Sequence, residues 1–305
     1  MKSADPALNR SIVKLRAVVP EDAFTAGILG TERIGNGIVI SADGLILTVG
    51  YLITEATDVW LTVDAGQEVA GHALAYDQVT GFGLVLPLAK PDLAPLALGS
   101  SAAVRPGDRA RVVSYPEFAN QQAVQILARR EFAGAWEYLL EDAIFTAPAH
   151  PHWSGAALVD DQGALVGLGS LLVREMVGGE ETNANMFVPT DLLKPILHDL
   201  VARGRARRQS RPWLGVYAVE VTGRVYVTGV AEGSPAQLAD IREGDLIAQV
   251  GAENVRTLAG FYRSVWSLGS AGIGVPLTAI RGGTSLNVNL RSVDRTDLLK
   301  KPQAH

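Results

Sequence analysis

The sequence predicts a mainly β protein that ends in a smaller unit of mixed α and β structure. Short apolar, β-branched runs separated by turn residues recur along the first two thirds of the 305 residues, which is typical of an antiparallel barrel or sandwich. A basic segment that ends at a proline then interrupts this pattern. Residues 212–292, the last part, place one helical segment between strands, which is typical of a compact α+β unit.

The expected strands of the first part are apolar runs bounded by turn residues. Gly37–Ser41 and Leu45–Tyr51 flank the turn Ala42-Asp43-Gly44. Trp136, Tyr138 and Leu140 alternate, and we expect them to form one face of a strand that packs into the core. Further expected strands are Asp58–Val63, Ala110–Ser114, Ala143–Thr146 and Ala164–Leu168.

One amphipathic helix precedes the domain boundary. Apolar residues recur with helical spacing from Leu193 to Val201, after the capping residues Thr190 and Asp191, and Gly204 is the expected stop. Pro195 has to lie near the first turn, because a proline deeper in a helix is destabilising. Residues 204–211 form the expected linker. After it we expect a helix over Leu258–Leu268 and strands over Trp213–Val221, Arg224–Gly229, Leu246–Val250, Val275–Arg281 and Leu286–Leu290.

Composition excludes several function classes. The formal net charge is −5, so the chain lacks the global basic field of many nucleic-acid-binding proteins. The absence of cysteine excludes disulfides, a cysteine nucleophile and thiolate metal sites. No apolar run is long enough to predict a membrane span. The first ten residues lack a secretory-signal pattern, so we expect a cytoplasmic protein as the chain begins, or a periplasmic one if a leader precedes it.

Several stretches follow one another in a recognisable order: Gly35–Thr48, Asp77–Val85, Leu96–Gly107, Trp153–Val159, Phe187–Pro189 and Ser234–Ile247. In this order they resemble HtrA-type serine proteases, with residues 11–203 similar to the chymotrypsin-like domain and residues 212–292 similar to the PDZ domain. The resemblance implies a trypsin-like double β-barrel followed by a smaller α+β PDZ domain. It also implies a homo-oligomer, the trimer of the family.

The same resemblance places unexpected residues at the catalytic positions. Ser154 holds the nucleophile position, but Tyr51 stands where the family has its histidine base, and Gly81 stands where it has the aspartate. His152 replaces a glycine that helps to shape the oxyanion hole. A serine hydroxyl needs an adjacent base, and a neutral phenol is a poor proton acceptor at pH 7. We therefore expect little or no proteolysis.

Alternative interpretations remain open from the residues alone. His152 is a candidate alternative base for an active serine endopeptidase, oriented by Asp77 or Glu141. His150 and His152 supply two metal-ligand types, but the spacing indicates no third ligand, so no metal and no cofactor are predicted. The cluster Arg203–Arg211 is either a solvated linker, which we favour, or a site for nucleic acid or another anionic surface.

The PDZ-like part retains the features that peptide binding needs. By resemblance, the backbone N–H groups of Leu214, Gly215 and Val216 hold a peptide carboxylate, and protein C-termini or extended peptides are the expected partners. The helix supplies the other wall of the groove, with candidate residues Phe261, Tyr262 and Val265, some of which have to be core. The predicted function is a pseudoprotease that binds peptides. A groove filled by the protein's own tail or barrel is the competing expectation.

Overall fold

The computed structural model describes residues 5–63, 66–90, 93–118 and 121–300. These residues divide into two compact units, which are described separately. Of the described residues, the first unit takes those between 5 and 130, residues 142–207 and residues 299–300. The second unit takes residues 208–298 together with a short separate piece, residues 131–141. The second unit is therefore built from two parts of the chain that are distant in sequence.

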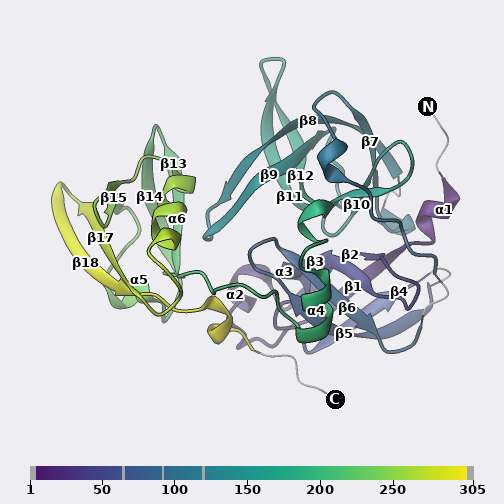
Figure 1. The fold of residues 1–305 in the computed structure, drawn as a ribbon, viewed down its shortest axis with the longest axis horizontal. Helices are drawn as coiled ribbons and strands as arrows, with labels where there is room; N and C mark the ends of the chain where they lie inside the picture. Colours follow the sequence, from purple (N-terminus) through teal and green to yellow (C-terminus); the bar gives the residue numbers. More distant parts are fainter. Residues whose placement is uncertain (1–4, 64–65, 91–92, 119–120, 301–305) are drawn as a thin grey trace. The chain divides into compact units, whose positions relative to one another are not determined.

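Six antiparallel strands close the first barrel in the order β1-β2-β3-β6-β5-β4 (Figure 1). Inward-facing side chains such as Leu15, Leu61 and Phe82 are fully buried, as expected for the interior of a small barrel. The strands are β1 Ile12–Val18, β2 Glu32–Val39, β3 Ile46–Val49, β4 Asp58–Thr62, β5 Glu68–Tyr76 and β6 Phe82–Pro87, and the short helices are α1 Pro6–Asn9, α2 Ala26–Leu29 and α3 Gly50–Ile53.

A second closed barrel in the same unit has the order β10-β11-β12-β9-β8-β7 (Figure 1). Its core contains Val112, Ile144, Leu158 and Phe187, and the loop between β9 and β10 carries Ser154. The strands are β7 Arg109–Val113, β8 Gln121–Gly134, β9 Tyr138–Ala147, β10 Ala157–Val159, β11 Leu165–Val177 and β12 Glu180–Pro189; they are followed by the 3-10 turn η4 Thr190–Leu192 and helix α4 Leu197–Arg203.

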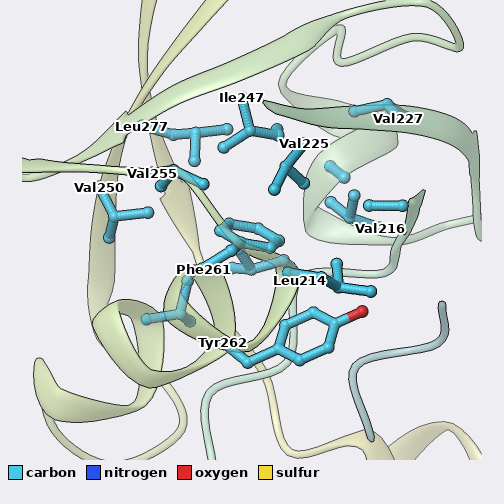
Figure 2. Packing of buried hydrophobic residues seen from close by; sticks show 14 of the residues in the cluster. Leu214, Val216, Val225, Val227, Ile247, Val250, Val255, Phe261, Tyr262 and Leu277 are labelled. Atoms are coloured by element: carbon cyan, nitrogen blue, oxygen red, sulfur yellow. The ribbon is translucent and has the colours of Figure 1, made fainter. Parts of the chain in front are cut away.

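The second unit is one antiparallel sheet with a helix packed against it. The strand order is β13-β14-β15-β17-β18, and β16 pairs with β15. Figure 2 shows the buried cluster, in which the ring of Phe261 lies among side chains from the sheet. The strands are β13 Val216–Val221, β14 Arg224–Val230, β15 Leu246–Val250, β16 Glu253–Asn254, β17 Gly274–Arg281 and β18 Thr284–Arg291; the helices are α5 Pro235–Leu238, α6 Leu258–Ser267 and the 3-10 turn η5 Arg295–Leu298.

The expected fold class is confirmed, with three local differences. The strand expected over Leu45–Tyr51 ends at Val49, and Tyr51 lies on helix α3. The expected long helix begins at Leu197, because Pro195 has no N–H to donate within it. Trp136 lies in a turn rather than in a strand, because the chain reverses at Glu137, which has a positive φ of 60°.

Candidate active site and peptide groove

Ser154 is held between the two barrels by tight backbone contacts. Gly155 follows it with a φ of 73°, a conformation that strongly favours glycine, and donates its N–H to the Gly169 carbonyl at 2.9 Å. A Cβ at position 155 would lie 2.1 Å from the carbonyl oxygen of Asn36. The glycine after the serine is therefore required for this loop conformation, whatever chemistry the hydroxyl performs.

The hydroxyl of Ser154 lies against a phenol. Tyr51 Oη is 2.9 Å from Ser154 Oγ and 2.8 Å from the carbonyl oxygen of Ser170. Within the described residues, Tyr51 is the hydrogen-bond partner of the Ser154 side chain, and no imidazole is. The phenol has a single proton, and the Ser170 carbonyl can only accept. Both hydrogen bonds can form together when Tyr51 donates its proton to the Ser170 carbonyl and the Ser154 hydroxyl donates its own proton to the phenol oxygen.

Burial makes this phenol a weaker acid than usual. It raises the pKa of Tyr51 to about 12, although the hydrogen bond with Ser154 acts in the opposite direction. About one phenol in 100,000 is then ionised at pH 7, and removing the proton at that pH costs about 7 kcal/mol. An un-ionised phenol has no basic site that could take the serine proton. The group beside Ser154 therefore works poorly as a general base at neutral pH.

The backbone N–H of His152 already has a partner within the same loop. It donates to Nδ1 of His150 at 3.0 Å. His150 is fully buried, and burial lowers its pKa to about 4, with the charge of His152 acting in the same direction. The ring is thus neutral at pH 7 and keeps a lone pair on Nδ1. In chymotrypsin-like proteases the N–H two residues before the nucleophile helps to bind the oxyanion. Here that N–H is directed at an imidazole.

Two buried polar residues that the sequence analysis missed position this site. Asn36 donates from Nδ2 to the carbonyls of His152 (3.1 Å) and Ser154 (2.9 Å), and its Oδ1 accepts from the Tyr115 N–H. Asn36 lies inside the run Gly35–Thr48 that resembles HtrA-type proteases. An asparagine between two glycines is typical of a turn, so its sequence gives no sign of these hydrogen bonds.

Arg33 is the second missed residue, and it holds the helix that carries Tyr51. Its guanidinium donates to the carbonyls of Tyr51 (2.7 Å) and Thr54 (2.9 Å), at the end of α3. It also donates to Thr25 Oγ1, and the same hydroxyl donates to the Glu55 carboxylate. Burial lowers the pKa of Arg33, whereas the charge of Glu55 raises it. A lone arginine in a strand carries no sequence signal for this role.

Gly81 and Asp77 shape the turn that follows β5. Gly81 has a φ of 84°, and its carbonyl accepts the Gly50 N–H at 2.7 Å, next to Tyr51 in the chain. The Asp77 carboxylate accepts from the N–H and hydroxyl of Thr80 at 3.0 and 2.6 Å. Both residues thus have structural roles in this turn.

In the second unit, the three N–H groups expected to hold a carboxylate converge on one. Leu214, Gly215 and Val216 donate to Oε1 of Glu137 at 3.1, 2.7 and 3.0 Å. Gly215 has a φ of 79°, which lets successive N–H groups point to the same side. Glu137 belongs to the tip of the β8–β9 hairpin and was not singled out by its sequence, which shows an isolated acidic residue among aromatic ones.

The three helix residues expected near the groove differ in their placement. Phe261 and Val265 are buried in the core of the second unit. Figure 2 shows Tyr262 at the edge of this cluster, and its hydroxyl donates to the Gly134 carbonyl at 2.7 Å. Of the three, Tyr262 alone presents a polar atom, and that atom contacts the same hairpin tip as the carboxylate-holding N–H groups.

The basic segment Arg203–Arg211 makes local contacts. Arg207 pairs with Asp199 at 3.4 Å, and the guanidinium of Arg211 lies 4.0 Å from the centre of the Trp266 ring. Such exposed contacts contribute little to stability. Within the described ranges, no group of three or more potential ligands is placed to hold a metal ion. In the same ranges, every helix is too short or too polar to cross a bilayer.

Family models identify both parts of the chain. Residues 35–168 match the trypsin-like peptidase domain, and residues 212–291 match the PDZ domain. The chain therefore contains a trypsin-like peptidase domain followed by one PDZ domain, the domain pair of the HtrA-type proteases that it resembles. The PDZ match covers the carboxylate-holding loop, and the peptidase match covers both Tyr51 and Ser154.

Curated relatives and solved structures agree with this family. A probable periplasmic serine endoprotease DegP-like from Chlamydia trachomatis is 25% identical over 269 residues, which is 83% of this chain and 52% of that protein. The periplasmic pH-dependent serine endoprotease DegQ of Escherichia coli is 24% identical over 271 residues, 85% of this chain and 59% of DegQ. The chain thus spans little more than half the length of these relatives.

Solved structures share the fold along nearly the whole chain. The HtrA-type protease AlgW with a decapeptide has a TM-score of 0.56 at 20% identity, covering 97% of this chain and 98% of that one. A serine endoprotease from Yersinia pestis has a TM-score of 0.53 at 20% identity, covering 94% and 95%. At 20% identity, this similarity shows a shared fold and nothing further.

Proposed function

We propose that this HtrA-type chain is a non-proteolytic protein that binds protein C-termini or extended peptides through its PDZ domain. One observation carries the proposal: the phenol of Tyr51 lies 2.9 Å from Ser154 Oγ, where the family resemblance expects an imidazole base. With the pKa of Tyr51 near 12, this partner cannot take the serine proton at neutral pH. Loss of the base lowers kcat on the order of 10⁶-fold in a comparable serine protease.

A second feature supports the absence of proteolysis. In the family-like geometry, the N–H of residue 152 would stabilise the developing oxyanion, but here it donates to His150. Removing one oxyanion donor from a serine protease lowers kcat on the order of 10²–10³-fold. Base and oxyanion donor are therefore both compromised, and both losses raise the barrier to attack of the serine on the peptide carbonyl.

Peptide binding is supported by the loop of the PDZ domain. Its three backbone N–H groups lie within 3.1 Å of Oε1 of the Glu137 carboxylate. The same hydrogen bonds capture a C-terminal carboxylate in peptide recognition. The loop thus keeps the groups that its binding function needs, whereas the serine site lacks the base that its catalysis needs. We propose protein C-termini as the ligand class for this loop.

A fluorophosphonate probe tests the loss of catalysis directly. The full-length chain and Ser154→Ala are incubated with the probe and, separately, with casein, alone and with a pool of C-terminal peptides; trypsin is the positive control. We expect no labelling of Ser154 and equal, background casein turnover in both chains. Labelling or turnover that is abolished by Ser154→Ala would overturn the proposal and favour an active enzyme that uses a base such as His152.

A further inference from the structure

The tip of the β8–β9 hairpin is part of the PDZ unit, although its strands belong to the peptidase domain. Residues 131–141 cluster with residues 208–298. The chain reverses over residues 135–137, and Glu137 adopts a φ of 60°, which is uncommon for a residue with a side chain. The hydrogen bonds of the Glu137 carboxylate to Leu214, Gly215 and Val216 hold the residue in this unfavourable conformation.

The carboxylate of Glu137 occupies the position of a peptide C-terminus. Its Oε1 accepts from Leu214, Gly215 and Val216, and its Oε2 accepts from Leu214 at 3.1 Å. Only 6% of the residue is exposed to solvent. These are the N–H groups that a C-terminal carboxylate needs, so one loop cannot hold both carboxylates at once.

The backbone of the tip also uses groups that line the groove. The Ala135 carbonyl accepts the N–H of Ala218 on β13 at 3.0 Å. Tyr262 on α6 donates to the Gly134 carbonyl, and its oxygen accepts the Glu137 N–H at 3.2 Å. An extended peptide that adds to a PDZ domain forms its bonds between the same two elements, a strand and a helix. The tip therefore blocks the backbone sites as well as the carboxylate site.

Neighbouring contacts keep the tip close to the loop. Leu139, two residues after Glu137, is buried in the core cluster of the PDZ unit. Glu131, at the other side of the tip, forms an ion pair with Arg263 on α6. A tethered group competes at a high effective concentration, on the order of millimolar for short connections. Glu137 can thus leave the loop and return without the hairpin leaving the domain.

We propose that Glu137 is an internal, exchangeable ligand of the PDZ carboxylate loop, so that a protein C-terminus binds only by displacing this side chain. This regulation deepens the proposed peptide-binding function and rests on it. A ligand that binds a fractionally open site has its affinity reduced by the open fraction. The intact chain is therefore a weaker peptide binder than its own loop geometry allows.

The test compares variants of the full chain for binding of one defined probe. The probe is a fluorescein-labelled pool of decapeptides that end in an apolar residue with a free carboxylate, and the control probe is the same pool with amidated ends. Glu137→Ala removes the internal carboxylate, and Glu137→Gln retains its shape without the charge. Glu141→Gln is the matched control, because Glu141 lies on the same hairpin piece and is exposed.

We expect Glu137→Ala to bind the free-acid pool at least about tenfold more tightly than the intact chain, as for a groove that is open one tenth of the time or less. Glu137→Gln should also bind the free-acid pool more tightly, and Glu141→Gln should bind it with the affinity of the intact chain. Equal affinities of the intact chain and Glu137→Ala would overturn the gating while the peptide-binding function stands. Failure of every folded chain to bind the free-acid pool would overturn both.

Hydrogen exchange on the intact chain gives a readout that does not depend on a mutation. Addition of the free-acid pool should increase the exchange of residues 131–141, because the tip is released, while Leu214, Gly215 and Val216 stay protected by the incoming carboxylate. Peptide binding without any increase in exchange at the tip would show that the peptide does not displace Glu137.

Discussion

At the scale of single residues, Glu137 combines two opposing effects. Burial raises its pKa to about 7, whereas the N–H groups of Val216, Leu214 and Gly215 and the charge of Arg295 on η5 lower it. The other titratable groups that face it are the phenols of Tyr262 on α6 and Tyr217 on β13, whose pKa values are raised. Desolvation is the largest of these effects, so the docked carboxyl holds its proton to a higher pH than a solvated one does.

The sign of the resulting pH dependence follows from linkage. A released Glu137 has a pKa near its ordinary 4.5, and the docked group has a pKa of about 7. Docking is therefore fully stabilised below about pH 4.5 and loses stability as the pH rises to 7, by about 1.4 kcal/mol per pH unit within that window. The internal ligand is held more firmly in mildly acidic solution than in neutral solution.

Protection against hydrogen exchange should report this loss. In the absence of peptide, we expect protection factors at Leu214, Gly215 and Val216 to be about twentyfold lower at pH 7.5 than at pH 5.5, after correction for intrinsic exchange. Glu137→Gln cannot ionise and should show no such change. A difference of the same size in Glu137→Gln would mean that another group controls the docking.

At the scale of elements, the position of Tyr51 depends on a one-turn helix with external support. Helix α3 has four residues, too few to be stable alone, and the Arg33 guanidinium satisfies carbonyls at its end. Arg33 is 4% exposed and also contacts Thr25, which donates to Glu55. The altered serine site is thus held by a buried polar network in the first barrel, not by the helix itself.

Removal of this support should be measurable by urea unfolding. Arg33→Met leaves the carbonyls of Tyr51 and Thr54 without the guanidinium donor and the Glu55 carboxylate without a nearby cation. We therefore expect the free energy of unfolding to fall by about 3 kcal/mol. Arg16→Met is the matched control: Arg16 lies partly exposed on β1 and pairs with Glu32 at 3.4 Å. Its substitution should change the free energy of unfolding by no more than about 0.5 kcal/mol. Equal effects of the two variants would contradict the structural role of Arg33.

At the scale of the whole molecule, the chain passes repeatedly between its two units. It changes unit after residues 130, 141, 207 and 298. Each unit therefore contains residues from both sides of the linker 204–211: the PDZ unit takes in the hairpin tip, and the peptidase unit takes in residues 299–300. A break in the linker alone does not separate the sequence into two complete units.

Limited trypsin digestion should demonstrate this connectivity. Arg205, Arg207 and Arg208 are exposed in the linker and are the expected cleavage points, since proline follows Arg211. Because the fragment before the cut supplies Leu139 and Glu137 to the core and loop of the PDZ unit, the two fragments should co-elute in size-exclusion chromatography and separate in urea. Separation in native buffer would contradict the shared construction of that unit.

Much of the fold could be predicted from the sequence because local patterns carry it. Gly204 was expected to end the helix, and it caps α4 with a left-handed φ of 72°. The Ala42-Asp43-Gly44 turn lies between β2 and β3 as expected. The prediction differed at Tyr51, which lies on a helix supported by the distant Arg33. It also differed at Trp136, which lies in a turn beside Glu137 with its positive φ. Neighbouring residues in the sequence indicate neither feature.

By itself, the sequence determined which chemical groups exist: a serine at position 154, with Tyr51 and Gly81 where the family resemblance expects a histidine and an aspartate, and a loop with glycine where three N–H groups can converge. The tertiary structure alone decided what those groups contact. It placed a phenol on Ser154, His150 on the N–H of His152, and Glu137 in the carboxylate loop. The physical reason is distance along the chain: Glu137 lies 78 residues from Gly215, and only folding brings such groups together.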